Sequence, residues 1–224
     1  MESIEAPQDD ETCSETHARK RRSSKKQEFL EKKKQIIQHL RPEDTILIED
    51  ESTFYRSGDP RKMWALKGTK PILRTYNSHE KVNVIGAINP FEDEGIYGQI
   101  ETLNALNFEI FLRKIFEVYG GSGKIYMFLD NARSHHAKLL KPFLESVKDQ
   151  FELVFLPPYS PDLSEIEKLW QEIKSEVVYN GVYNTFTDFK NALTRALRRK
   201  NNSGYVRSLF DEKNFLCEEI LMEV

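Results

Sequence analysis

Short apolar runs and segments of helical periodicity alternate along most of the chain, as they do in domains that pack helices against a sheet. Apolar runs bounded by polar or turn residues predict five strands, at 45–50, 81–88, 95–100, 124–129 and 151–156. Apolar residues at three-to-four spacing predict helices over 27–40, 104–119, 135–149, 165–177 and 185–200. This order of elements predicts an α/β fold: a mixed five-stranded sheet with helices on both faces.

The two ends of the chain differ in character from the middle. Residues 1–26 are polar, first acidic and then densely basic over 19–26, and we expect this tail to be disordered. The basic block is either a solvated tail or a sequence-independent contact to phosphates. A linker helix over 27–42, ended by Arg41 and Pro42, leads into one domain at 43–205, and a closing helix follows at 206–224.

Composition narrows the class of protein. With 224 residues and 39% hydrophobic content, the chain can bury one good core. No apolar run approaches the roughly 18 residues of a membrane helix, and no signal peptide is evident. The only cysteines, Cys13 and Cys217, lack the spacing of a disulfide framework or a zinc site, which favours a cytoplasmic protein. A net charge of −3 means that any contact to DNA must come from local basic patches.

Three carboxylates stand where two strands end and one helix begins. Asp50 closes the first strand, Asp130 closes the fourth, and Glu167 lies in the first helical turn after a stiff loop with three prolines. Taken alone, Glu167 is the capping-box partner of Ser164. Clustered carboxylates repel one another unless cations hold them together, and oxygen-only ligands suit Mg²⁺ or Mn²⁺. The pattern therefore predicts a metal site at any point where these three acids converge.

Three motifs give the chain a family resemblance. The segments IEDES at 48–52, LDNARSHHA at 129–137 and LPPYSPDLSEIEKLW at 156–170 together resemble the catalytic domain of mariner-like DDE transposases, in particular their prokaryotic insertion-sequence branch. The resemblance runs from about residue 27 to about residue 200. It implies an RNase H-like fold, two Mg²⁺ (or Mn²⁺) ions, DNA strand transfer and a catalytic, metal-binding triad of Asp50, Asp130 and Glu167.

The resemblance also assigns supporting roles near Asp130. A histidine at this place supports the active site in the family, and His135 is the better match; Asn131 can orient a ligand or a nearby loop. Direct metal ligation by His135 and His136 is disfavoured, because the catalytic ions prefer oxygen ligands.

The chain departs from the family pattern just before Glu167. The family usually has Asn-Pro there, whereas this chain has Ser164 and Glu165, which still suit an N-cap and the first turn of a helix. Glu165 is expected to point about 200° round the helix from Glu167. We assign the metal-binding role to Glu167 because it occupies the motif position.

Basic residues interleaved with aromatic ones follow the first strand. The aromatic Trp64 is expected to pack on the core, and Lys67-Gly68 predicts a turn within a hairpin. Such a basic hairpin beside an acidic metal site suits phosphodiester recognition, although an ordinary surface hairpin has the same pattern. The expected DNA contacts are Arg56, Arg61, Lys62, Lys67, Lys70 and Arg74.

These features lead to an expected function. The chain is expected to be the catalytic domain of a DNA transposase, which cleaves transposon ends and transfers the strand into target DNA. The alternatives are an RNase H-like nuclease or resolvase acting on structured nucleic acid, and an inactive or co-opted DNA-binding relic. We expect a homodimer in the DNA complex, no membrane association and a cytoplasmic location at nucleoid DNA. The end-recognition helix-turn-helix is expected either on a separate polypeptide or to be missing because the gene is truncated.

Overall fold

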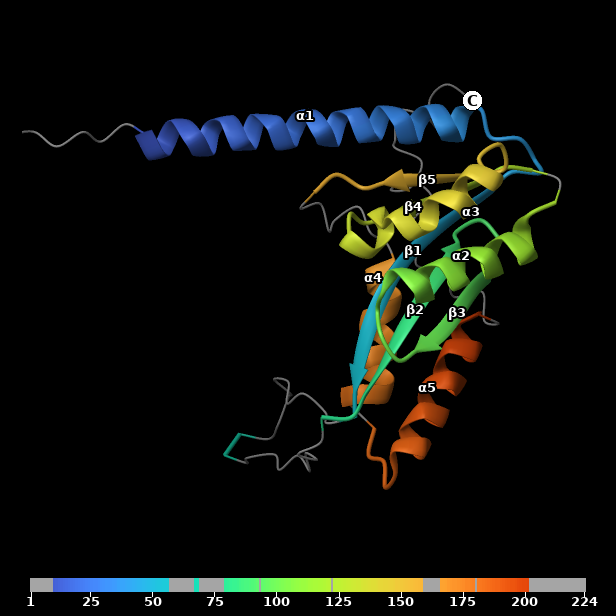
Figure 1. Ribbon diagram of the computed structural model, residues 1–224. Coiled ribbons are helices and arrows are strands. Elements are labelled where there is room, and N and C mark those ends of the chain that lie inside the picture. Colours follow the sequence, from blue (N-terminus) through green and yellow to red (C-terminus); the bar gives the residue numbers. More distant parts are fainter. Residues whose placement is uncertain are drawn as a thin grey trace, which may run out of the picture.

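The computed structural model describes residues 10–56, 67–68, 79–92, 94–121, 123–158, 166–179 and 181–201. Five strands form one sheet in the order β3-β2-β1-β4-β5 (Figure 1). Its strands are β1 (Thr45–Tyr55), β2 (Lys81–Asn89), β3 (Glu94–Ile100), β4 (Ile125–Leu129) and β5 (Phe151–Phe155). β1, β2 and β3 form an antiparallel meander, and β4 and β5 run parallel to β1. The predicted mixed five-stranded sheet is confirmed.

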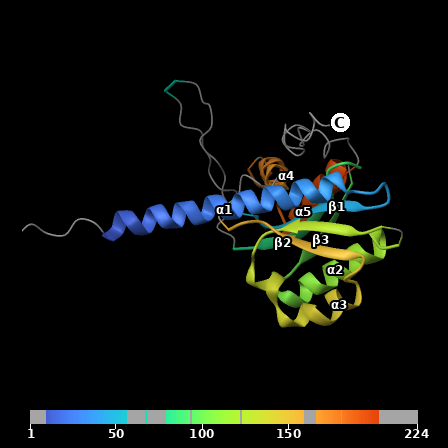
Figure 2. The same cartoon turned by 90° about the horizontal axis from the view of Figure 1, so that it is seen from above.

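Helices cover both faces of the sheet, as expected. On one face lie α1 (Asp10–Gln38), α4 (Ile166–Ile173) and α5 (Phe186–Asn201), and on the other lie α2 (Ala105–Tyr119) and the short α3 (Lys141–Ser146) (Figure 2). Side chains of β1 alternate between these layers. Ile46 and Ile48 pack with α4 and α5, while Leu47 packs with α2. The sheet therefore separates two hydrophobic cores, and β1 contributes to each.

β1 is longer than its apolar run predicts. Residues 45–48 pair with β4, whereas residues 48–55 pair with β2, so the strand continues to Tyr55 after its parallel neighbour has ended. The prediction that the strand ends at Asp50 is therefore wrong. Asp50 instead lies within β1, directly beyond the end of its parallel pairing, because backbone pairing with β2 holds this polar stretch in an extended conformation.

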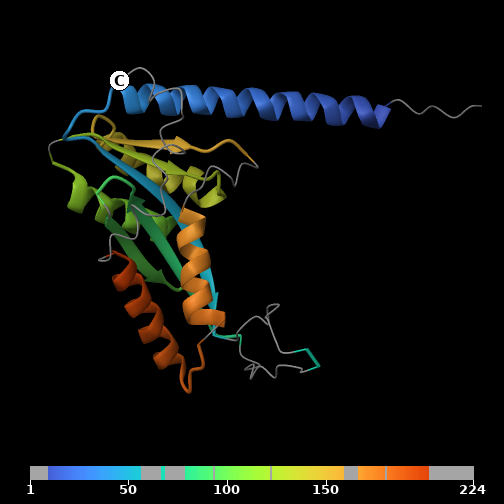
Figure 3. The same ribbon diagram turned by 180° about the vertical axis from the view of Figure 1, so that it is seen from behind.

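α1 is also longer than expected. It begins at Asp10, so the predicted disorder of residues 1–26 is wrong for residues 10–26, and its N-terminal half extends past the sheet (Figures 1 and 3). The segment 10–26 is rich in Glu, Lys and Arg, which are good helix formers even where no apolar face is buried. The C-terminal half packs on the sheet through Phe29, whose ring lies 6.0 Å from that of Phe128.

Two predicted helices are irregular. The segment expected to be helical at 135–149 consists of 3₁₀ turns at Arg133–His136 and Lys138–Leu140 followed by α3, which has Pro142 in its first turn. α4 continues beyond Ile173 as a π-helical stretch at Lys174–Tyr179. The predicted closing helix at 206–224 lies outside the described residues.

Candidate metal-dependent active site

The register of the parallel strands places two of the predicted acids side by side. Ile48 of β1 pairs with Phe128 of β4, so Asp50 and Asp130 each lie two residues beyond the same pair. Neighbouring strands run about 4.8 Å apart. Ile48 and Phe128 both belong to the core under α4, and side chains two residues apart in a strand share a face. Asp50 therefore points toward the helix that carries Glu167.

Asp50 is held from the α4 side by an indole. Trp170 donates its Nε1–H to Oδ2 of Asp50 at 3.0 Å. Burial is the main cause of a pKa of about 6 for Asp50; hydrogen bonds from the Glu51 backbone and from Trp170 partly offset it, and the negative charges of Asp130 and Glu167 raise it further. The charges of Asp130 and Glu167 thus reach Asp50, although the three residues are distant in sequence.

Glu167 owes its position to buried neighbours in the same helix. Ile166, Leu169 and Trp170 are buried and fix the rotation of α4, so that Glu167 in the first turn remains partly exposed. The helix N-terminus favours a carboxylate there. Ser164 and Glu165, the point of departure from the family pattern, lie outside the described residues.

Asp130 is the most exposed acid of the three, with 61% of its side chain accessible. The backbone N–H of Ala132 donates to its Oδ1 at 2.8 Å, which fixes the turn after β4. Nδ1 of His135 lies 3.1 Å from the same oxygen. One side of this carboxylate is therefore oriented by the protein, and the rest is open to a ligand.

Asn131 links the end of β4 to the end of β5. Its Nδ2 donates to the carbonyl of Leu156, and its Oδ1 lies 3.3 Å from Nε2 of His136. The His136 ring stacks on Phe155 with centroids 4.3 Å apart. Asn131 thus orients the start of the loop that leads from β5 toward α4.

Sequence reasoning missed two residues that position Asp50. Trp170 was noted only as the last residue of the third motif, and Gly86 was not singled out. Gly86 pairs with Asp50 across β1 and β2, and a Cβ at Gly86 would lie 2.7 Å from the indole of Trp170. The absence of a side chain at Gly86 is therefore what lets Trp170 approach Asp50. A glycine inside an apolar strand was the available signal for such a close approach.

The predicted DNA contacts have different outcomes. Lys67 is exposed beside the left-handed Gly68, at the expected turn. Arg61, Lys62, Lys70 and Arg74 lie outside the described residues, as does Trp64.

Arg56 needs a correction. It forms an ion pair with Glu80 and donates to the carbonyls of Tyr183 (3.1 Å) and Asn184 (2.7 Å). Only 13% of its side chain is exposed. Arg56 therefore ties the end of β1 to the segment before α5, and we no longer assign it to DNA.

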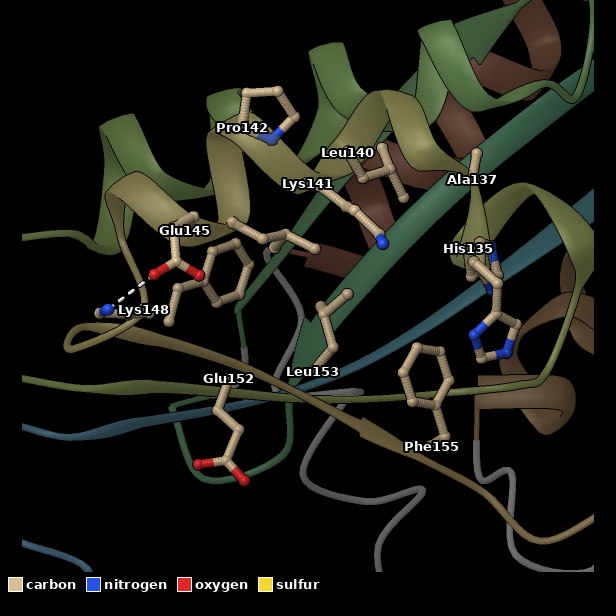
Figure 4. Close-up of a pocket in the computed structure, with 13 residues that line it drawn as sticks. His135, Ala137, Leu140, Lys141, Pro142, Glu145, Lys148, Glu152, Leu153 and Phe155 are labelled. Atoms are coloured by element: carbon tan, nitrogen blue, oxygen red, sulfur yellow. Dashed lines mark hydrogen bonds and ion pairs between the residues drawn. The ribbon is translucent and has the colours of Figure 1, made fainter.

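An open groove of about 960 Å³ adjoins the site. Its lining comes from the segment that follows β4 on one side, including Lys141 and Leu140, and from β5 on the other, including Leu153 and Phe155 (Figure 4). His135 and the neighbouring histidine lie at one end of it. Through His135, which contacts Asp130, this end of the groove lies next to the site.

A mixed sheet in this order, with acids beyond the parallel part of β1, after β4 and on α4, is the architecture of an RNase H-like domain. The structure of the Mos1 mariner paired-end complex with Mn is similar, with a TM-score of 0.68 and 16% identity, over 100% of this chain and 67% of that chain. The catalytic domain of Mos1 mariner transposase gives a TM-score of 0.61 at 15% identity, over 90% of this chain and 93% of that chain. The predicted fold class is confirmed.

Sequence comparison shows the family. Residues 45–190, more than half of the chain, match the family described as DDE superfamily endonuclease, and the chain belongs to this family. An insertion element IS630 uncharacterized 39 kDa protein of Shigella sonnei is 24% identical over 139 residues. That match covers 62% of this chain and 40% of the Shigella protein, and the chain spans 61% of the length of the Mos1 protein in the strand transfer complex. The predicted family is confirmed.

The donor atoms at the site suit hard divalent cations. Asp50, Asp130 and Glu167 offer only oxygen ligands, and Asp130 leaves most of its carboxylate accessible. The Mos1 paired-end complex has been solved both with Mn and with Mg.

No helix in the part of the chain described by the structure is long and apolar enough to span a membrane.

Cation binding at Asp50 is expected to weaken in mild acid. Because the folded-state pKa of Asp50 is about 6, above its ordinary value of 3.8, the folded protein takes up a proton there more readily than the unfolded chain does. Protonation of Asp50 therefore contributes to the free energy of unfolding. This contribution is fully present below pH 3.8 and is lost as the pH rises through about 6. Below that pH the proton competes with the cation, so Mn²⁺ affinity should fall about fivefold between pH 6 and pH 5. Calorimetric titration with Mn²⁺ at several pH values checks this. The Asp50→Asn protein should bind Mn²⁺ weakly at every pH. A wild-type affinity that did not change with pH would contradict the assignment of Asp50 as a metal ligand.

Proposed function

We propose that this chain is the catalytic domain of a DNA transposase, which cleaves DNA at transposon ends and transfers the strand into target DNA. The observation that carries the proposal is that Asp50 of β1 and Asp130, directly after β4, each lie two residues beyond the Ile48–Phe128 pair, and that Asp50 faces α4, whose first turn carries Glu167. Family membership and the fold shared with the Mos1 catalytic domain support it.

The three acids would hold two Mg²⁺ or Mn²⁺ ions. When bound, such ions supply Lewis-acid stabilisation of the charge that develops in phosphoryl transfer. The protein prepares this site before any ligand arrives: Trp170 fixes Asp50, the Ala132 backbone fixes Asp130, and the buried face of α4 fixes Glu167.

The proposed reaction has two steps at phosphorus. A water oxygen attacks the phosphodiester at the transposon end, the bond to the 3′ oxygen breaks, and the strand leaves with a 3′ hydroxyl. That hydroxyl then attacks a phosphodiester of target DNA and displaces its 3′ oxygen. No covalent bond between enzyme and DNA is required, because water is the nucleophile of the first step and the freed 3′ hydroxyl is the nucleophile of the second.

DNA contacts and partners follow from the same proposal. Lys67, Arg61, Lys62, Lys70 and Arg74 would contact phosphates beside the acids. Two copies would act on two ends held together, by analogy with the Mos1 transposase, which has been solved as a paired-end complex with its left transposon end. We propose that residues 43–205 form the catalytic domain, that α1 links it to neighbouring parts, and that a helix-turn-helix on a separate polypeptide recognises the ends. The protein would act at nucleoid DNA in the cytoplasm.

The test offers the full chain three substrates in Mg²⁺: duplex DNA carrying the inverted repeats that flank its gene, an RNA–DNA hybrid and a four-way junction. Nicking at the end of the repeat, followed by joining to a second duplex, is the expected result. Preferential cleavage of the hybrid or of the junction would replace transposition by an RNase H-like nuclease or a resolvase. Loss of all cleavage, with DNA binding retained, would indicate a co-opted relic.

A further inference from the structure

A second group of ligand atoms lies on the opposite face of β1 from Asp50. Glu49 and Glu51 flank Asp50 and so point to the α2 side of the sheet, where His135 meets them. Nε2 of His135 lies 3.7 Å from Oε1 of Glu51 and 4.0 Å from Oε2 of Glu49. One ligand atom from each of the three residues lies within 4.8 Å of the other two.

This group is buried, and several of its ligand atoms lack hydrogen-bond partners. The side chains of Glu49 and His135 are 0% and 1% exposed, and that of Glu51 is 15% exposed. Both carboxylate oxygens of Glu49 and Nε2 of His135 have no hydrogen-bond partner within the described part of the chain. Leaving a carboxylate in such a place uncompensated is costly, so the arrangement calls for a positive species between the three side chains.

The environment of the imidazole shows which nitrogen is available. Nδ1 of His135 lies 3.2 Å from the carbonyl oxygen of Asp130 and 3.1 Å from its Oδ1. Both neighbours are acceptors, so Nδ1 donates a proton to them, whereas Nε2 faces the carboxylates of Glu49 and Glu51 and makes no hydrogen bond to either. The ring of Phe108, with its centroid 4.2 Å from that of His135, closes the remaining side.

We propose that Glu49, Glu51 and His135 bind a first-row transition-metal cation such as Zn²⁺, on the opposite face of β1 from Asp50 and with Asp130 between the two sites. Zinc lies about 2.0–2.2 Å from imidazole nitrogen and carboxylate oxygen, so its ligands are about 3.3–3.6 Å apart. The observed 3.7 and 4.0 Å need only a small contraction. In metal sites, the ring nitrogen of a histidine that does not bind the metal commonly donates a hydrogen bond to a carboxylate, which orients the ring. Asp130 is the carboxylate in this position next to Nδ1 of His135.

The ligand types distinguish the site of Glu49, Glu51 and His135 (the rear site) from the site of Asp50, Asp130 and Glu167 (the front site). The three acids around Asp50 offer oxygen alone, which suits Mg²⁺, whereas an imidazole nitrogen with two carboxylates favours Zn²⁺ over Mg²⁺. A divalent charge also balances Glu49 and Glu51, which the burial of Glu49 otherwise makes unfavourable. The inference stands on these contacts alone and does not rest on the proposed transposase activity.

The first experiment uses the wild-type chain and therefore does not depend on the folding of a variant. Crystals of the full chain are soaked in Zn²⁺, and anomalous scattering is recorded on both sides of the zinc absorption edge. A peak within bonding distance of Nε2 of His135 and of carboxylate oxygens of Glu49 and Glu51 supports the site. Zinc found only among the acids of the other face, or nowhere, overturns it.

The second experiment measures zinc affinity in a background of Asp50→Asn with Glu167→Gln, which removes the front ligands but leaves Asp130 in place. This double variant should still bind one equivalent of Zn²⁺ and prefer it to Mg²⁺. Adding Glu49→Gln or His135→Asn should weaken binding by at least about tenfold. The matched control is His136→Asn, whose exposed ring stacks on Phe155 and should leave affinity unchanged. Equal zinc affinity in the His135→Asn and His136→Asn proteins would refute the proposal.

Discussion

Asp130→Asn is expected to reduce metal-dependent DNA cleavage by at least about 10³-fold, which corresponds to roughly 4 kcal/mol of transition-state stabilisation. Asparagine keeps an oxygen for the Ala132 N–H but removes the charge that a divalent cation requires. Asp130 is largely exposed, so the free energy of unfolding should change by no more than about 0.5 kcal/mol. Nicking of transposon-end duplex in Mg²⁺ measures the loss.

The control for this variant is a carboxylate far from the site. Glu117 lies on α2, is 69% exposed and pairs with Lys114. Glu117→Gln should cleave at the wild-type rate, because it removes one surface charge without changing any group near the reacting phosphate. An Asp130→Asn protein that cleaved as fast as the Glu117→Gln protein would remove Asp130 from the site.

Trp170→Ala is expected to lower the free energy of unfolding by about 3–5 kcal/mol, the usual cost of truncating a buried aromatic side chain. Trp170 is 3% exposed, and its indole makes edge-on contacts with Phe54 and Tyr97 at centroid distances of 6.0 and 6.2 Å. Denaturant unfolding measures the loss. The matched control is Tyr55→Ala, since Tyr55 is an aromatic residue of β1 that is 48% exposed and should cost far less.

A second substitution separates packing from hydrogen bonding at the same residue. Trp170→Phe retains a buried ring but removes the N–H that Asp50 accepts. Because that hydrogen bond lowers the pKa of Asp50, its loss should raise this pKa above about 6 and weaken Mn²⁺ binding at pH 6 more than at pH 8. Equal metal affinity in Trp170→Phe and wild-type protein at both pH values would show that the indole supports the fold alone.

The architecture was predictable because each strand of the sheet is a short apolar run and each main helix has a clear apolar face. The run before Asp130 and the helix that carries Leu169 and Trp170 were located from these patterns. The convergence of the acids depended on the motif resemblance rather than on periodicity. What no local pattern contains is register: the pairing of Ile48 with Phe128, which brings Asp50 and Asp130 level, arises only when the strands meet.

Partners distant in sequence explain the other misses. Arg56 has the sequence surroundings of a DNA contact, and only the folded chain brings the carbonyls of Tyr183 and Asn184 to its guanidinium. The complete burial of Glu49 beside His135 was not predicted, because it follows from the packing of α2. The helix at 10–26 was missed because low hydrophobicity was interpreted as disorder, although helix propensity does not require apolar residues.

The alternation of acids along β1 makes the strand unusually sensitive to a change in its length. If one codon were inserted between Ile48 and Glu49, every later residue of the strand would turn over, so that Asp50 would face the α2 side while Glu49 faced Trp170. Both faces would then lose their ligand set in a single event. Gene variants with such an insertion should therefore be inactive, although the reading frame and the hydrophobic content are preserved. Insertions at the turn around Glu92, which joins β2 to β3, should be tolerated.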